Sequence, residues 1–142
     1  MPAQKQEKKT KLLSQQFLQE SCCLMCAFTS DCTSTVDSSV CCWIIRSMVK
    51  YYYNHPSIFI WGMHNEIISN HQNGYDMTQM YYRYLKENGG NRLVTYAAGY
   101  PLTDICLEFC DIICINNYWG WYGGTVEKWD DYVDQIRKKE RV

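Results

Sequence analysis

Hydrophobic and polar positions along the chain predict alternating helices and strands from about residue 38 onward. Residues 37–39 offer N-cap oxygens to a helix that carries Val40, Ile44 and Met48 on one face and ends before a proline turn. The run SIFIWGMHN, residues 57–65, is apolar at consecutive positions. A run that is apolar on both faces is typical of a parallel strand covered on each side. The first strand is therefore predicted to be buried.

Helical and strand patterns of apolar residues alternate through the rest of the chain. Residues 77–85 carry apolar side chains at helical spacing and precede a Gly-Gly pair that suits a helix C-cap. Residues 92–98 and 111–119 are rich in β-branched and apolar residues, which predicts two further strands, with a short helix between them at residues 102–109. Residues 126–141 predict a last helix with one apolar face and a basic end.

This order of elements indicates an α/β fold built from right-handed βαβ units around a parallel sheet. An open doubly wound sheet and a (β/α)8 barrel both fit. No Gly-rich phosphate-binding fingerprint follows any predicted strand, which favours a barrel or part of one. Residues 1–39 show neither period, so they are interpreted as an atypical N-terminal segment, a tail or an irregular stretch, before a domain at residues 40–142.

Composition and charge narrow the possible partners and location. Fourteen basic and 15 acidic residues give a net charge of −1, which disfavours nucleic acid as a partner. No apolar run approaches the roughly 20 residues of a membrane span, and the chain start lacks a signal-peptide core, so no membrane association and a cytoplasmic location are expected. Nine cysteines suggest reduced thiols. Cys23 and Cys26 have zinc-ligand spacing, so a Cys-rich metal site remains an alternative hypothesis.

Candidate chemistry lies where the predicted strands end, because barrel enzymes place their sites there. The first strand ends at Asn65 and Glu66, and the third ends at Asn116 and Tyr118, followed closely by Tyr122. Aromatic faces stack on sugar rings, amides bind hydroxyls, and a carboxyl group in partly apolar surroundings can act as a general acid. These residue types together indicate a glycosidase.

Two stretches carry a resemblance to a known family. NHPSIFIWGMHNE, residues 54–66, closely resembles the acid/base strand of glycoside hydrolase family 2, and residues 92–124 resemble the stretch that follows it in the family's β-glucuronidases. The resemblance covers roughly residues 40–142 and implies strands four to six of a (β/α)8 barrel. Leu93 stands where the family usually has proline, a change at the start of a strand.

The resemblance also implies roles for individual residues. Glu66 matches the general acid/base, and Asn65 matches the amide that binds the sugar 2-hydroxyl. Tyr118 matches the tyrosine that hydrogen-bonds the nucleophile, while Asn116 and Tyr122 match positions close to the sugar. The implied partner is a carbohydrate, a β-glucuronide or β-galactoside. The chemistry requires no metal or organic cofactor.

The second carboxylate of the reaction has no match in this sequence. A retaining glycosidase needs two carboxyl groups about 5 to 5.5 Å apart. The family carries its nucleophile on the seventh strand in a Glu-Tyr-Gly-like motif, which is absent here, and Glu108, Glu127 and Glu140 are no convincing substitutes. We therefore expect an incomplete copy of the barrel, inactive alone, with open sheet edges that favour self-association. The alternative is a non-catalytic remnant that binds sugar or protein.

Overall fold

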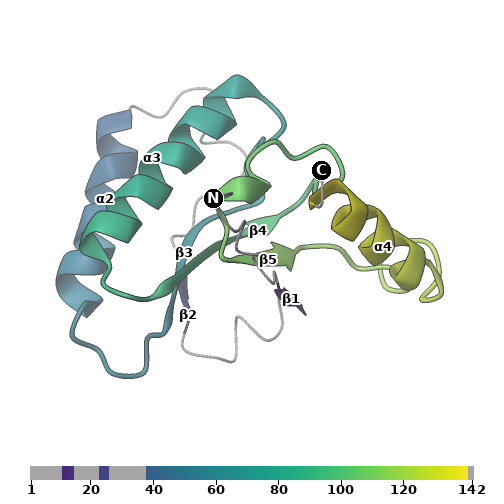
Figure 1. The fold of residues 1–142 in the computed structure, drawn as a ribbon, viewed down its shortest axis with the longest axis horizontal. Coiled ribbons are helices and arrows are strands. Elements are labelled where there is room, and N and C mark those ends of the chain that lie inside the picture. The colour runs from purple at the N-terminus through teal and green to yellow at the C-terminus, as the bar shows by residue number, and fades with distance from the viewer. Residues whose placement is uncertain (1–10, 15–22, 26–37, 141–142) are drawn as a thin grey trace, which may run out of the picture.

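The computed structural model describes residues 11–14, 23–25 and 38–140, and these residues are organised around a five-stranded sheet (Figure 1). The strands lie in the order β1-β5-β4-β3-β2, and every neighbouring pair is parallel. Their bounds are β1 (Lys11–Ser14), β2 (Cys23–Met25), β3 (Ile60–Asn65), β4 (Leu93–Ala98) and β5 (Ile112–Ile115). Because the strands are parallel, their carboxyl ends lie along one edge of the sheet, where the predicted site residues are found.

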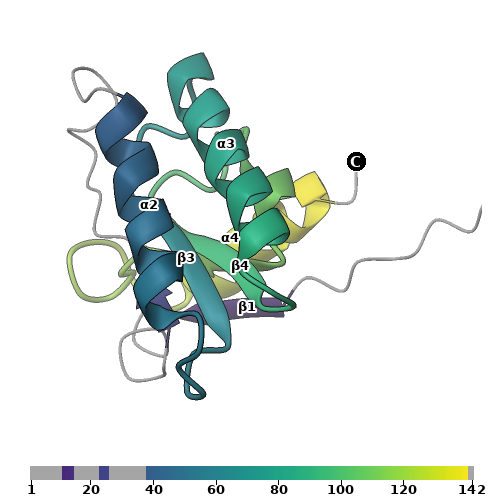
Figure 2. The same cartoon turned by 90° about the vertical axis from the view of Figure 1, so that its left-hand side faces the viewer.

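Helices α2 (Ser38–Tyr52) and α3 (Gln72–Asn88) lie side by side over one face of the sheet (Figures 1 and 2). A short 3-10 helix, η2 (Leu107–Phe109), precedes β5, and α4 (Lys128–Glu140) follows it. This arrangement of parallel strands and helices is the predicted α/β fold and corresponds to part of a (β/α)8 barrel. Among the described residues, no helix is long and apolar enough to cross a membrane.

Strand β3 is buried on both faces, as its continuous apolar run predicted. Trp61 and Met63 contribute to the core between the sheet and the helices, and neither is exposed to solvent. Ile60 belongs instead to a second buried cluster, with Ile112 and Cys114 of β5. The two clusters on opposite sides of one sheet explain why β3 shows no alternation of apolar and polar residues.

Two short strands lie within the N-terminal segment, for which the sequence predicted no strand. β1 pairs with β5 from Lys11 opposite Ile112 to Ser14 opposite Ile115, and β2 pairs with β3. Strands of three and four residues are too short to show a period of their own, and pairing on an existing edge uses only backbone groups. The division of the chain near residue 39 stays a prediction.

The chain between β4 and β5 is less helical than predicted. The helix expected at residues 102–109 is reduced to the three residues of η2. Asp104 accounts for part of this difference, because its Oδ1 accepts the backbone N–H of Cys106 at 2.7 Å and so removes that donor from a helical ladder. The last helix also begins later than expected, at Lys128, which leaves Val126 outside it and exposed.

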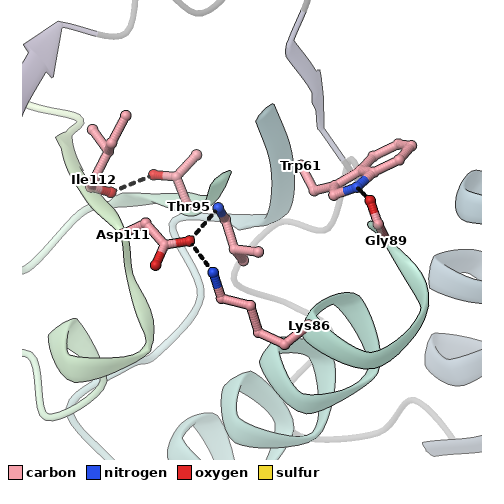
Figure 3. Close-up of polar contacts among 7 residues, drawn as sticks. Trp61, Lys86, Gly89, Thr95, Asp111 and Ile112 are labelled. Atoms are coloured by element: carbon pink, nitrogen blue, oxygen red, sulfur yellow. Dashed lines mark hydrogen bonds and ion pairs between the residues drawn. The ribbon is translucent and has the colours of Figure 1, made fainter. Parts of the chain in front are cut away.

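Polar contacts fasten the end of the sheet opposite the predicted site (Figure 3). Asp111, just before β5, accepts the Val94 backbone N–H at 2.8 Å and forms an ion pair with Lys86 of α3. The indole Nε1 of Trp61 donates to the Gly89 carbonyl at 2.9 Å. These contacts fix α3 to the amino ends of the strands and leave the carboxyl ends available for the site.

Candidate active site

Glu66 follows the last residue of β3 in an unusual backbone conformation. Its φ of 52° lies in the left-handed region, which costs a residue with a side chain about 1 to 2 kcal/mol. The Glu66 N–H nevertheless donates to the Ala97 carbonyl at 2.9 Å, so the residue remains attached to β4. The pairing of β3 with β4 shifts register between Gly62 and Asn65. The strand end therefore holds Glu66 in a conformation that needs support from its surroundings.

Asn116 brings the end of β5 to the Glu66 carboxyl group. Its side-chain Nδ2 donates to Oε1 of Glu66, and its backbone N–H donates to the Ala98 carbonyl at 2.9 Å. The Oδ1 atoms of Asn65 and Asn116 are both buried, and neither has a hydrogen-bond partner among the described residues. Asn65 precedes Glu66 and Asn116 contacts its carboxyl group, so two amide oxygens that can accept hydrogen bonds from hydroxyl groups lie on these residues.

The two predicted tyrosines lie on the loop after β5. Burial raises the pKa of the Tyr118 hydroxyl, and the nearby Glu66 carboxylate and Tyr122 raise it further. The rings of Tyr118 and Tyr122 meet edge to face with centroids 5.3 Å apart. Tyr122 is 80% exposed, as is its neighbour Trp121. The loop therefore presents aromatic faces to solvent close to the carboxyl group.

Gly99, at the end of β4, is a part of the site that the sequence did not reveal. A Cβ atom at this position would lie 3.4 Å from both Cβ and Cγ of Glu66. A side chain at this position would therefore pack directly against the Glu66 side chain. A glycine at the end of a strand is common enough that its type alone carries no functional signal.

His64 lies below the site on the helix side of the sheet and is fully buried. Its Nε2 is 2.9 Å from the Thr78 hydroxyl, which is itself 2.7 Å from the Gly74 carbonyl and donates to it. The hydroxyl must then accept, so the histidine carries its proton on Nε2. Burial lowers the pKa of His64 to about 3. His64 therefore contributes packing and a hydrogen bond, not a proton in the neutral pH range.

Among the described residues, the glutamates that follow Glu66 in the sequence and bear on the nucleophile question have hydrogen-bond partners other than Glu66. Glu108 accepts a hydrogen bond from the Tyr75 hydroxyl at 3.0 Å, and Glu127 is hydrogen-bonded to Thr125. The described part of the chain contains no cluster of three or more histidine, cysteine or acidic side chains that could hold a metal ion. The side chains of Cys23, Cys26 and Glu140 lie outside the described residues, so the hypothesis of a Cys-rich metal site stays a prediction.

A comparison with models of protein families assigns the chain to one family. The model of the glycosyl hydrolases family 2 TIM barrel domain matches residues 10–141. The chain belongs to glycosyl hydrolase family 2. The family match begins at residue 10 and therefore includes most of the N-terminal segment, in addition to the two stretches that carried the resemblance.

Individual family 2 proteins share about a third of their residues with the chain over the matched stretch. A β-glucuronidase from Bacteroides fragilis is 31% identical over 93 residues, and one from Streptococcus agalactiae is 29% identical over 82 residues. These matches cover 65% and 55% of this chain but only 13% and 14% of the relatives. The chain thus spans about one seventh of the length of these two relatives.

Solved structures of family 2 enzymes support the same fold. A β-galacturonidase from Eisenbergiella tayi, solved with bound galacturonate, superimposes with a TM-score of 0.67 and 29% sequence identity. The superposition covers 78% of this chain and 20% of that enzyme. The parallel sheet and its helices therefore correspond to one part of a family 2 barrel.

Proposed function

We propose that Glu66 is the general acid/base of a retaining β-glycosidase whose substrates are β-glucuronides. In this reaction Glu66 protonates the glycosidic oxygen as the bond to the sugar breaks, and then removes a proton from the water that attacks the glycosyl-enzyme intermediate. The observation that carries the proposal is the pairing of Glu66 with Asn116 at the carboxyl ends of β3 and β5. The names of the family 2 relatives favour a uronic acid as the sugar.

The surroundings of Glu66 suit a sugar ring. Asn65 and Asn116 supply buried amide oxygens that have no partner among the described residues. These oxygens can accept hydrogen bonds from the hydroxyl groups of the sugar. Tyr118 and Tyr122 supply exposed aromatic faces beside them, and a sugar ring can stack on such faces. We assign Asn65 to the 2-hydroxyl and the other three residues to contacts around the ring.

We further propose that this chain binds the sugar without hydrolysing it. The retaining mechanism requires a nucleophilic carboxylate about 5 to 5.5 Å from the acid/base. The Glu-Tyr-Gly-like motif that carries this nucleophile in the family is absent from the present sequence. Protonation of the leaving group alone does not form the covalent intermediate. The acid/base half of the site is present, and the nucleophile half is to be supplied by the rest of a complete barrel.

A binding and turnover experiment on the purified chain tests both statements. We expect glucuronate to shift the NMR signals of the Asn65 and Asn116 side-chain amides, with weak affinity, and nitrophenyl β-glucuronide to be hydrolysed no faster than by the Glu66→Gln variant. Asn116→Ala should abolish the glucuronate-dependent shift of the remaining Asn65 signals, whereas Asn91→Ala, an exposed site at the amino end of β4, should preserve the shifts of both amides. Absence of any shift from a folded chain would contradict sugar binding. Turnover that depends on Glu66 would contradict the proposal that the chain is inactive.

A further inference from the structure

We propose that a buried hydrogen bond between Ser69 and Asp104 positions Glu66. Ser69 lies in the loop after β3, three residues beyond Glu66, and Asp104 lies in the loop after β4. The Ser69 hydroxyl donates to Oδ2 of Asp104 at 2.6 Å, and both residues are 1% exposed. These two side chains are positioning residues, because they act on the carboxyl group through the backbone that carries it. The inference rests on the acid/base role proposed for Glu66.

The Asp104 carboxyl group accepts hydrogen bonds from Ser69 and from the backbone of its own loop. Its second oxygen, Oδ1, accepts the Cys106 backbone N–H at 2.7 Å. Burial raises the pKa of the Asp104 carboxyl, while the hydrogen bonds from Ser69 and Cys106 act in the opposite direction. Each carboxyl oxygen thus has a donor, which a buried acceptor requires. An asparagine here could keep both contacts only if the Ser69 hydroxyl turned from donor to acceptor, and it would carry no charge.

Backbone contacts around Ser69 complete the connection. The Ser69 carbonyl accepts the Ile105 N–H at 3.1 Å and the Cys106 thiol at 3.2 Å. On the other side of the loop, the Lys139 ammonium group of α4 donates to the carbonyls of Asp104 and Pro101. The loop after β4 is therefore held between the loop that carries Glu66 and the last turn of α4.

This connection provides the support that the Glu66 backbone needs. The left-handed conformation of Glu66 is unfavourable in isolation and persists only where the surrounding structure imposes it. On one side Glu66 is bonded to Ala97 of β4, and on the other Ile67 is buried and its carbonyl accepts the Ser69 N–H at 2.7 Å. After the buried Ile67, Ser69 is the first residue beyond Glu66 whose polar side chain fastens this segment to another loop. Release of Ser69 should let the backbone at Glu66 relax and move its carboxyl group away from Asn116.

Hydrogen exchange of single backbone amides, followed by NMR without any sugar, tests the inference. In Ser69→Ala and Asp104→Asn we expect the Glu66 amide to exchange at least about 10-fold faster relative to the Met63 amide inside β3. The side-chain NH₂ signals of Asn116 should shift at the same time, because its bond to the Glu66 carboxylate weakens. A purely structural role would accelerate exchange across the sheet without this local change.

Asp111→Asn is the matched control, because Asp111 also accepts from two donors but lies at the opposite end of the sheet. It should speed exchange of the Val94 amide and leave the Glu66-to-Met63 ratio and the Asn116 signals unchanged. An unchanged Glu66 ratio in Ser69→Ala, or an equal increase at all amides in all three variants, overturns the inference. Should Asp104→Asn fail to fold, Ser69→Ala alone decides.

The same samples separate this inference from the proposed function. A local effect at Glu66 in a chain that binds no glucuronate supports the positioning role and contradicts sugar binding. When the parent chain does bind glucuronate, Ser69→Ala should weaken its affinity by about 10-fold, whereas Asp111→Asn should leave it unchanged. Equal affinity of Ser69→Ala and the parent chain counts against the positioning role.

Discussion

The imidazole of His64 links the stability of the molecule to pH. Burial lowers its pKa from 6.5 to about 3, so the unfolded chain binds a proton between these values while the folded chain does not. The contribution of His64 to stability is complete above pH 6.5 and is lost as the pH falls toward 3. At pH 4.5 we expect a loss of about 3 kcal/mol in the free energy of unfolding from this residue.

Urea unfolding at pH 7.0, 5.5 and 4.5 measures this loss. His64→Gln should be less stable than the parent chain at pH 7.0 and should lose less stability on acidification. Ile45→Val, which removes one methylene group from the same core, should lower the free energy of unfolding by a similar amount at every pH. Asp104 works against the effect, because its raised pKa lets the folded state take up a proton before the unfolded chain does. The prediction would be wrong if the free energy of unfolding changed with pH by the same amount in His64→Gln and in the parent chain.

Single residues also show what the sequence can and cannot reveal about the site. Asn65, Glu66 and Asn116 were visible as candidates because each stands where an apolar run stops, and parallel strands bring such ends to one edge. Their catalytic and binding roles stay predictions. Ser69 and Asp104 gave no signal, because they are 35 positions apart in loops of ordinary composition and meet only after the chain has folded.

At the scale of elements, the close approach of α3 to β3 depends on the absence of a side chain at Gly89. Its φ of −85° is accessible to alanine, so contacts rather than backbone strain decide the outcome. A Cβ atom there would lie 2.5 Å from the Leu85 carbonyl oxygen and 2.6 Å from Nε1 of Trp61. Gly89→Ala should therefore separate α3 from Trp61 and lower the free energy of unfolding by about 1 to 3 kcal/mol.

Gly99→Ala is the companion substitution at the other end of the sheet. Its new Cβ atom would lie 3.4 Å from Glu66 side-chain atoms, a tight contact that a small shift relieves, so we expect a loss below about 1 kcal/mol. Thermal unfolding of both variants compares their stability, and the NMR signal of the Trp61 indole N–H, which donates to the Gly89 carbonyl, reports on the α3 contact. A Gly99→Ala variant that is less stable than Gly89→Ala would contradict this assignment of contacts.

The sequence predicted best those elements whose apolar pattern extends over most of their length. α2, α3 and the three central strands were visible because an apolar face or a fully apolar run extends through each of them. β1 and β2 were not visible, because short strands on a sheet edge are defined by backbone pairing with β5 and β3. The reduction of the predicted helix at residues 102–109 depended on the side chain of Asp104, which no periodic pattern records.

At the scale of the whole molecule, the sheet is open where a complete barrel is closed. Among the described residues, β1 pairs only with β5 and β2 only with β3, so each strand has an outer row of backbone groups that no other described strand covers. A closed barrel has no such edges. Because the chain corresponds to one part of a family 2 barrel, its five strands account for the α/β fold without closing it.

We therefore expect the chain to self-associate through these edges, and two proline substitutions in β1 identify the edge involved. Successive residues of a parallel strand direct their backbone groups to opposite neighbours, so Leu12→Pro and Leu13→Pro remove N–H groups on different sides. The variant that loses the group facing β5 should expose β5 and associate more strongly. The variant that loses the outward group should block the edge and associate less. Sedimentation velocity over a micromolar concentration series measures both effects, and a parent chain that stays monomeric throughout, or two variants that change in the same direction, would contradict association through β1.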